Sequence, residues 1–333
     1  MQPIESRRYV LAALAGGAAG LIGAPMLTSG RSFAQEPPPE TTTIRLPKGN
    51  VLCNLPQYLA DDLLRAEGFT DIQRLPTAGP QLVAKLASGE LDLTMAYTPN
   101  AIMTIDSGTP MTLLAGVHVG CNVVFAHEGI RSIRDLKGKK VGASFVGNPL
   151  VAAMAAYVGL DPAKDIEWIP APSAKEDFIA RKIDAFMALP PDPQELRARR
   201  IGHEIVNSSL DRPWSQLYCC TLAGNREFVR KHPIATKRAL RAILRSTDLC
   251  VSDPPRAARR MVDEGFTASY DYMLQLLNEA SYKVWRDYDV EDSIRFYALR
   301  LREAGMIKSI PNKIIADGTD WRFLNDLKRE LKA

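Results

Sequence analysis

The sequence predicts an α/β protein with two lobes, each a mainly parallel sheet flanked by helices, and a C-terminal arm of helices. Three observations predict this fold. The 333 residues are 46% hydrophobic, which is enough apolar material for two domains. A pattern of strand and helix signals between residues 71 and 97 recurs between residues 165 and 189. Beyond residue 222, the periodicity is helical.

The first 34 residues have the features of an export signal. Arg7 and Arg8 precede a weakly apolar run rich in glycine and alanine, as in twin-arginine signals. The small residues that follow favour cleavage after Ala34, which predicts an exported, periplasmic protein. An uncleaved membrane anchor is the alternative, because the length of the run is marginal for a membrane span. Residues 35–41 contain three consecutive prolines and are expected to form a stiff linker.

The recurring pattern predicts the elements of both lobes. Asp71–Pro76 resembles Asp165–Pro170 at an offset of 94 residues, and Leu91–Ala96 resembles Ile183–Ala188 at an offset of 92. Chance similarity between two ordinary βαβ units is the alternative. Each copy predicts a strand, a loop, an amphipathic helix and a second strand, and one strand–helix unit precedes each copy. Besides the two first strands, the predicted elements are strands at 43–47, 93–97, 140–143 and 185–189, and helices at 55–66, 81–87, 150–158 and 175–181.

The segment after residue 222 predicts an arm of helices that packs on the first lobe. Apolar residues recur at spacings of three and four, as in Met273, Leu276, Leu277 and Ala280. The expected helices cover residues 226–231, 234–253, 255–264, 270–281, 290–304 and 321–331.

Composition and cysteine spacing exclude several functional classes. A net charge of +4 with 24% charged residues argues against a nucleic-acid binder. The five cysteines include no Cys-x-x-Cys pair, and His118 with Cys121 forms a single pair without a second one at ligand spacing. Buried free thiols are therefore expected, their pairing stays open, and no metal or cofactor is predicted.

A ligand site is expected at the carboxyl ends of the parallel strands, where loops and helix starts converge. These loops supply hydroxyls, amides and aromatic rings but few cationic side chains. This composition favours a neutral or singly anionic organic ligand, which could be aromatic. The candidate residues are Asn54, Thr77, Gly79, Tyr97, Thr98, Asn100 and His118 in the first lobe, and Ser144, Phe145, Asn148, Pro190, Asp192 and Trp214 in the second.

Several of these residues have an ordinary structural explanation as well. Asn54, Thr77 and Ser144 are equally suited to cap helices. Tyr97, Phe145 and His118 fit the interior of a core.

The motifs of the chain resemble those of the type II periplasmic solute-binding proteins of ABC importers. The resemblance rests on Leu86–Asp92, Gly108–Ala115, Gly159–Pro162 and, above all, Ile133–Gly142. It is closest to the group that binds nitrate, taurine, aliphatic sulfonates and thiamine-pyrimidine precursors. The resemblance implies a first lobe of residues 42–125 and 218–333 and a second lobe of residues 126–217.

These features together predict a monomeric solute receptor that is not an enzyme. It is expected to deliver a small organic ligand to an ABC permease, and the ligand could be sulfonate-like or pyrimidine-like. No nucleophile elbow, phosphate loop or HExxH motif is present in the sequence. Two alternatives stay open. One is an enzyme like the thiamine-pyrimidine synthases, whose eukaryotic CCCFC motif is represented here only by Tyr218-Cys219-Cys220. The other is a ligand sensor for a signalling partner.

Overall fold

The computed structural model describes residues 36–331 except residues 50, 78, 80 and 146. The predicted export signal and its cleavage after Ala34 lie outside the described residues and stay predictions. Among the helices that are described, none combines the length and the apolar character needed to cross a bilayer.

The first two strands of the chain form a parallel pair. Strand β1 (Thr43–Lys48) lies beside β2 (Asp71–Pro76), with α1 (Leu55–Tyr58) and α2 (Asp61–Ala66) between them in the chain. One continuous helix was expected over 55–66. It is interrupted at Leu59 and Ala60, whose ψ angles of 0° and −5° end the first helix and begin the second. The short 3-10 helix η1 (Leu52–Asn54) precedes α1.

A second sheet has the strand order β3-β10-β4. It is built from β3 (Leu93–Tyr97), β4 (Met111–Val119) and β10 (Tyr218–Asn225), and β10 runs antiparallel to both neighbours. Helices α3 (Gln81–Ser88) and α4 (Thr98–Asp106) flank β3 in the chain. Thr98 and Asn100 were expected in a loop of the ligand site, but α4 already begins at Thr98, because Pro99 in its first turn has the backbone angle that a helix start requires.

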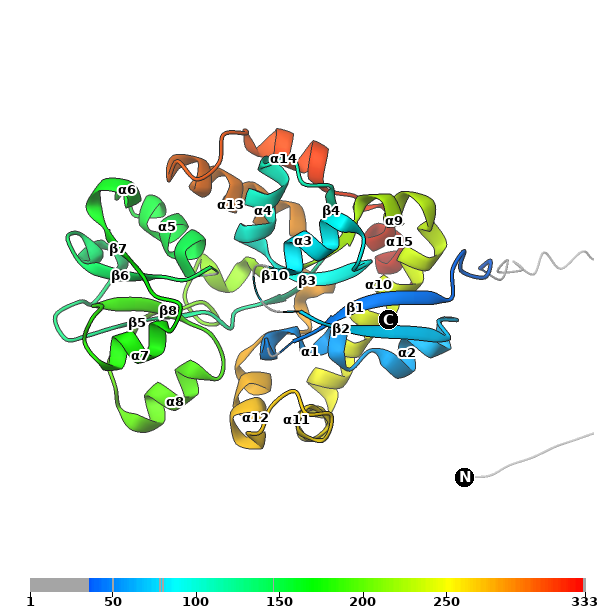
Figure 1. Cartoon of the computed structure of the whole chain (residues 1–333), viewed down its shortest axis with the longest axis horizontal. Coiled ribbons are helices and arrows are strands. Elements are labelled where there is room, and N and C mark those ends of the chain that lie inside the picture. Colours follow the sequence, from blue (N-terminus) through cyan, green and yellow to red (C-terminus); the bar gives the residue numbers. More distant parts are fainter. Residues whose placement is uncertain (1–35, 50, 78, 80, 146, 332–333) are drawn as a thin grey trace, which may run out of the picture. The chain divides into compact units, whose positions relative to one another are not determined.

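The third sheet contains the five strands between residues 123 and 207, in the order β7-β6-β8-β5-β9. Strand β6 is parallel to β7 and β8, whereas β5 is antiparallel to β8 and β9. Figure 1 shows helices beside these strands. The strands are β5 (Val123–Ala126), β6 (Lys140–Ala143), β7 (Glu167–Pro170), β8 (Ala185–Ala188) and β9 (His203–Asn207), and the helices are α5 (Gly147–Tyr157), α6 (Pro162–Asp165), α7 (Ala174–Ile179), α8 (Asp192–Arg199) and the 3-10 helices η2 (Ile133–Leu136) and η3 (Trp214–Gln216).

The predicted α/β class with parallel strands is confirmed. The parallel direction does not extend to β5 and β10, each of which directly follows a passage of the chain between the second and third sheets. A strand that enters or leaves a sheet directly, without a crossover helix, pairs antiparallel with its neighbours.

The arm of helices was expected to pack on the first lobe, and its packing is broader. Helix α10 packs on α1 and α2, whereas α13 packs on both α4 and α5, and α5 belongs to the third sheet. The arm also contains a helix that the sequence pattern missed, α14. The elements are α9 (Arg226–Lys231), α10 (Pro233–Ser252), α11 (Pro254–Asp263), α12 (Tyr270–Glu279), η4 (Val284–Arg286), α13 (Val290–Glu303), α14 (Pro311–Gly318) and α15 (Arg322–Glu330).

Candidate functional site

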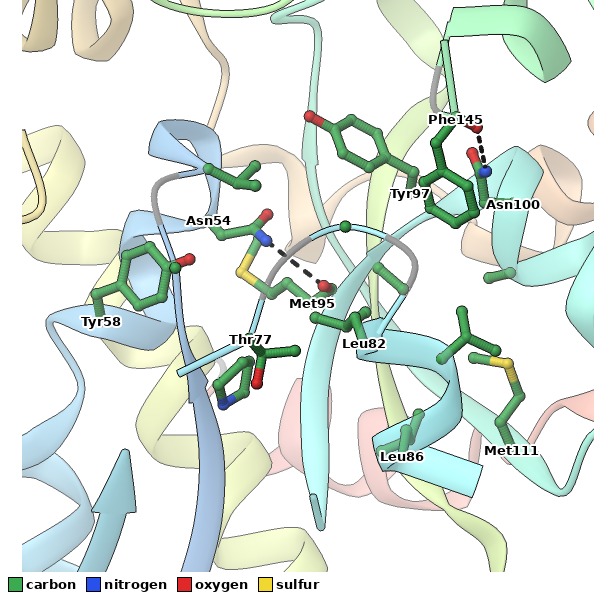
Figure 2. Close-up of a pocket in the computed structure, with 17 residues that line it drawn as sticks. Asn54, Tyr58, Thr77, Leu82, Leu86, Met95, Tyr97, Asn100, Met111 and Phe145 are labelled. Carbon is green, nitrogen blue, oxygen red and sulfur yellow. Dashed lines mark hydrogen bonds between the residues drawn. The ribbon is translucent and has the colours of Figure 1, made fainter. Parts of the chain in front are cut away.

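The candidate site is a pocket at the carboxyl ends of β1, β2 and β3, seen in Figure 2. Helices α3 and α4 supply further side chains, and Phe145 comes from the loop between β6 and α5. None of the 17 described lining residues carries a charge. They are Pro47, Gly49, Val51, Asn54, Tyr58, Thr77, Gly79, Leu82, Val83, Leu86, Met95, Ala96, Tyr97, Asn100, Ala101, Met111 and Phe145.

The structure places six of the candidate residues along this pocket. They come from four separate chain segments, at or after the carboxyl ends of β1, β2, β3 and β6. Strands β1, β2 and β6 have parallel partners, as the carboxyl-end rule expects, whereas β3 pairs antiparallel with β10. They are Asn54, Thr77, Gly79, Tyr97, Asn100 and Phe145.

Asn100 connects the pocket wall to the third sheet. Its Nδ2 donates a hydrogen bond of 2.8 Å to the carbonyl oxygen of Phe145, as Figure 2 shows. Its Oδ1 is buried and has no hydrogen-bond partner among the described residues. A buried acceptor without a partner is costly, so a donor on a ligand would be favourable at this atom.

Other polar groups of the pocket are already engaged. Asn54 Nδ2 donates to the carbonyl oxygen of Met95 over 3.5 Å, and Thr77 Oγ1 donates to that of Leu75 over 2.9 Å. The hydroxyl of Tyr97 lies 3.6 Å from the Sγ of Cys53, and burial raises the pKa of Tyr97 well above its usual value. Burial also raises the pKa of Tyr58, so both phenols stay protonated. The pocket therefore offers hydrogen bonds without charge.

Two candidates that were assigned to the predicted first lobe lie outside the pocket lining. Thr98 is fully buried in the first turn of α4, and its Oγ1 has no partner among the described residues. His118 is fully buried in β4, where its Nδ1 lies 3.3 Å from the Sγ of Cys219.

The remaining candidates of the second lobe also lie away from the pocket lining. Ser144 Oγ accepts a hydrogen bond of 2.9 Å from the backbone N–H of Gly147, the first residue of α5. Asn148 is half-buried in the first turn of the same helix. Trp214 is buried, with its ring edge-on to those of Tyr157 and Phe296.

Asp192 is engaged in an ion pair rather than free to hold a ligand amine. It lies at the start of α8, 3.1 Å from the Nζ of Lys175, and its burial raises its pKa. Pro190 precedes it with a cis peptide bond to Pro191.

The sequence interpretation missed the apolar wall of the pocket. Leu82, Val83 and Leu86 of α3 and Met111 at the start of β4 line it. An amphipathic helix is expected to turn such residues into the core, so the pattern could not distinguish them from ordinary core residues. The one available signal was position, because α3 follows directly after the loop of Thr77 and Gly79.

Comparisons with known proteins identify the family and the fold. Residues 71–257 match the family model described as NMT1/THI5 like. A protein of Haemophilus influenzae named for thiamine biosynthesis is 29% identical over 147 residues, which are 39% of this chain and 46% of that relative, so the chain spans less than half of that relative's length. The 4-amino-5-hydroxymethyl-2-methylpyrimidine phosphate synthase THI5 of Saccharomyces cerevisiae is 22% identical over 69% of this chain and 72% of its own length.

Among solved structures, the periplasmic nitrate-binding protein NrtA from Synechocystis PCC 6803 superposes with a TM-score of 0.75. Its sequence identity is 15%, and the match covers 88% of this chain and 90% of that one. The fold is therefore that of the periplasmic binding proteins, as the sequence motifs predicted.

Proposed function

Because this chain belongs to the NMT1/THI5-like family, we propose that it is a periplasmic solute receptor that captures a small organic ligand in the pocket of Figure 2 and delivers it to an ABC importer. The observation that carries the proposal is the pocket at the carboxyl ends of β1, β2 and β3, lined by uncharged residues from the strands and loops of three sheets. The predicted export signal and the resemblance to periplasmic receptors support the location and the permease as partner.

The lining favours an uncharged ligand. An ion moved from water into an apolar pocket without a counter-charge loses solvation that nothing restores. A flat, partly apolar molecule can instead contact Leu82 and Leu86 with its faces and use the free Oδ1 of Asn100 as an acceptor. An amino group on a heteroaromatic ring has this chemistry, so we favour a pyrimidine-like ligand without a phosphate group over a sulfonate.

The first experiment identifies the bound molecule. Protein purified quickly from the periplasm is analysed by native mass spectrometry, and the released ligand is identified after denaturation. We expect a small, uncharged molecule at one copy per chain. A thermal-shift series with pyrimidines, sulfonates and carboxylates then ranks affinities, since stabilisation grows with ligand concentration over Kd. Stabilisation by sulfonates alone would contradict the uncharged ligand, and stabilisation by no member together with an empty mass spectrum would contradict the receptor.

The match to the yeast synthase supports an enzyme as the second candidate. The two functions differ in what happens to the bound molecule. A receptor releases its ligand chemically unchanged after prolonged incubation, whereas a synthase converts it. Mass spectrometry of the recovered ligand over time distinguishes them, and conversion at a rate proportional to protein concentration would favour the synthase.

A further inference from the structure

Four of the five cysteines and one histidine gather in a single buried cluster, which we call the thiol cluster. Its members are between 0% and 4% exposed and come from chain segments far apart in the sequence: Cys53, His118, Cys121, Cys219 and Cys220. The structure contains no disulfide among the described cysteines. Such a density of soft ligand groups away from solvent is uncommon for ordinary core packing, in which a thiol acts only as a small apolar group.

The spacing within the thiol cluster matches that of a tetrahedral metal site. Cys121 Sγ lies 3.4 Å from Cys219 Sγ, which lies 3.3 Å from His118 Nδ1. Ligands bound tetrahedrally to Zn²⁺ at the usual bond lengths are about 3.8 Å apart for two sulfurs and about 3.6 Å apart for sulfur and nitrogen. Shifts of a few tenths of an ångström would therefore admit the ion.

Two sets of three ligand atoms share His118. In each set all atoms lie within 4.8 Å of one another, one set being His118, Cys121 and Cys219, the other Cys53, His118 and Cys220. Cys53 and Cys220 share His118 with the first set but are not within 4.8 Å of all its ligand atoms, so either thiol would have to move to become a fourth ligand.

Two amide side chains lie near the thiols of the cluster. Asn122 Oδ1 lies 3.8 Å from Cys121 Sγ, and Asn54 Oδ1 lies 3.8 Å from Cys220 Sγ. Rotation of the Asn122 amide would turn its N–H groups toward the Cys121 sulfur and so stabilise the negative charge of a bound thiolate, whereas the Asn54 N–H groups are already donated to Met95.

The cluster also lies where the chain passes between two sheets. Cys121 follows β4 immediately before β5, and Cys219 lies near the start of β10 on the return passage. The ion would therefore join the two connecting segments.

We propose that His118, Cys121 and Cys219 form the core of a structural site for a thiophilic divalent cation such as Zn²⁺, which the thiol of Cys53 or Cys220 completes by moving in as the fourth ligand. Binding replaces the thiol protons by the metal, and the protons leave to solvent. All four positions would be filled by the protein, as in structural sites, so the metal takes no part in binding the solute.

The test uses the exported protein produced in medium supplemented with zinc sulfate and isolated without reductant or chelator. Native mass spectrometry and elemental analysis are expected to give one zinc per chain. The double variant Cys121→Ser/Cys219→Ser is expected to lose it. Cys250→Ser is the matched control, because Cys250 is buried in α10 outside the cluster, and this variant is expected to retain the ion.

Three results would overturn the proposal. These are metal-free protein with all thiols reduced, a Cys121–Cys219 disulfide in the isolated protein, and zinc retained by the double variant. Should the double variant fail to fold, the unaltered protein produced with cobalt decides. Cobalt held by thiolates gives intense sulfur-to-metal charge-transfer absorption, and cobalt without that absorption would refute the site.

Discussion

The two copies of the repeated pattern use the same device to join their strands. Asp92 Oδ2 in the first copy accepts a hydrogen bond of 2.7 Å from the backbone N–H of Arg45, at β1. Asp184 Oδ2 in the second copy accepts one of 2.8 Å from the N–H of Lys140, at β6. In return, the backbone N–H of Asp92 donates to the carbonyl oxygen of Arg45, and that of Asp184 donates to the carbonyl oxygen of Lys140. The acid that precedes each second strand therefore fixes that strand beside its neighbour.

The copies differ in the helix that follows the first strand. At the offset of 94 residues, Leu82 and Val83 of α3 correspond to Glu176 and Asp177 of α7. Gln81 corresponds to Lys175, which bonds Glu195 over 2.7 Å and Asp192 over 3.1 Å. One copy has an apolar pocket where the other has an ion-pair network. A backbone pattern can thus be shared while a few side chains decide which copy can hold an organic molecule.

The largest expected effect concerns the shared aspartates. Asp92 is 1% exposed and forms an additional ion pair with the Arg45 guanidinium, which Asp184 does not share. We expect Asp92→Ala to lower the free energy of unfolding by about 3 kcal/mol, because buried donors lose their acceptor. For Asp184→Ala, where one backbone hydrogen bond is lost, we expect about 1 kcal/mol. Urea denaturation of both variants measures the difference, and equal losses would contradict the distinction between the copies.

A reciprocal exchange tests the pocket. Leu82→Glu places in the first copy the residue that the second copy has, and we expect ligand affinity to fall at least about 100-fold, because a carboxylate is desolvated in an apolar pocket. Glu176→Leu is the matched control in the second copy, and the affinity should stay unchanged. Both variants are compared by titration calorimetry with the ligand recovered from the protein. Full affinity in Leu82→Glu would place the ligand elsewhere.

The ion-pair network predicts a pH dependence confined to the second copy. Burial raises the pKa of Asp192, so its contribution to stability is present at low pH and is lost as pH rises through that raised pKa. The hydrogen bond from Lys175 opposes this rise. Lys175→Met should therefore raise the pKa of Asp192 further and widen the pH range over which the protein loses stability. We expect a deficit of about 1 to 2 kcal/mol at pH 7 that shrinks toward pH 4.

Gln81→Met is the control for this substitution, since Gln81 occupies the equivalent position and is exposed. Its stability should follow that of the unaltered protein at every pH. Chemical denaturation at several pH values compares the two variants. A deficit of Lys175→Met that is the same at pH 4 and pH 7 would show that packing, and not charge, causes it.

The smallest expected effect separates capping from binding. Ser144 Oγ accepts the N–H of Gly147, so Ser144→Ala should cost about 1 kcal/mol of stability and leave affinity unchanged. Thr77 lines the pocket and donates to Leu75, so Thr77→Ala should reduce affinity with a smaller loss of stability. Thermal unfolding with and without ligand measures both quantities. Loss of affinity in Ser144→Ala alone would reverse the two roles.

Local sequence patterns predicted the limits of those elements whose ends are marked by clear sequence signals. Strands β3 and β6 and helix α9 have the predicted limits, because alternation, a preceding acid or an asparagine cap marks their ends. Helix α14 was missed because it has only eight residues, Pro311 included, too few for a clear period. The break between α1 and α2 was missed because Leu59 and Ala60 are compatible with a continuous helix in sequence.

For the candidate residues too, the sequence predicted some features and missed others. The carboxyl-end rule brought Thr77, Tyr97 and Asn100 to one pocket, because it depends on strand direction, which sequence reveals. It could not tell that Trp214 turns toward Phe296 or that Lys175 reaches Asp192, because those contacts join elements far apart in the chain.

The sequence by itself determined the α/β class, the repeated strand–helix unit and the loops at which a ligand site could form, since these follow from periodicity and local turn chemistry. The tertiary structure alone decided which of those loops meet in a pocket without charge. It also decided that cysteines from residues 53 to 220 meet around His118. Both outcomes depend on the packing of segments whose separation along the chain carries no information about their distance in space.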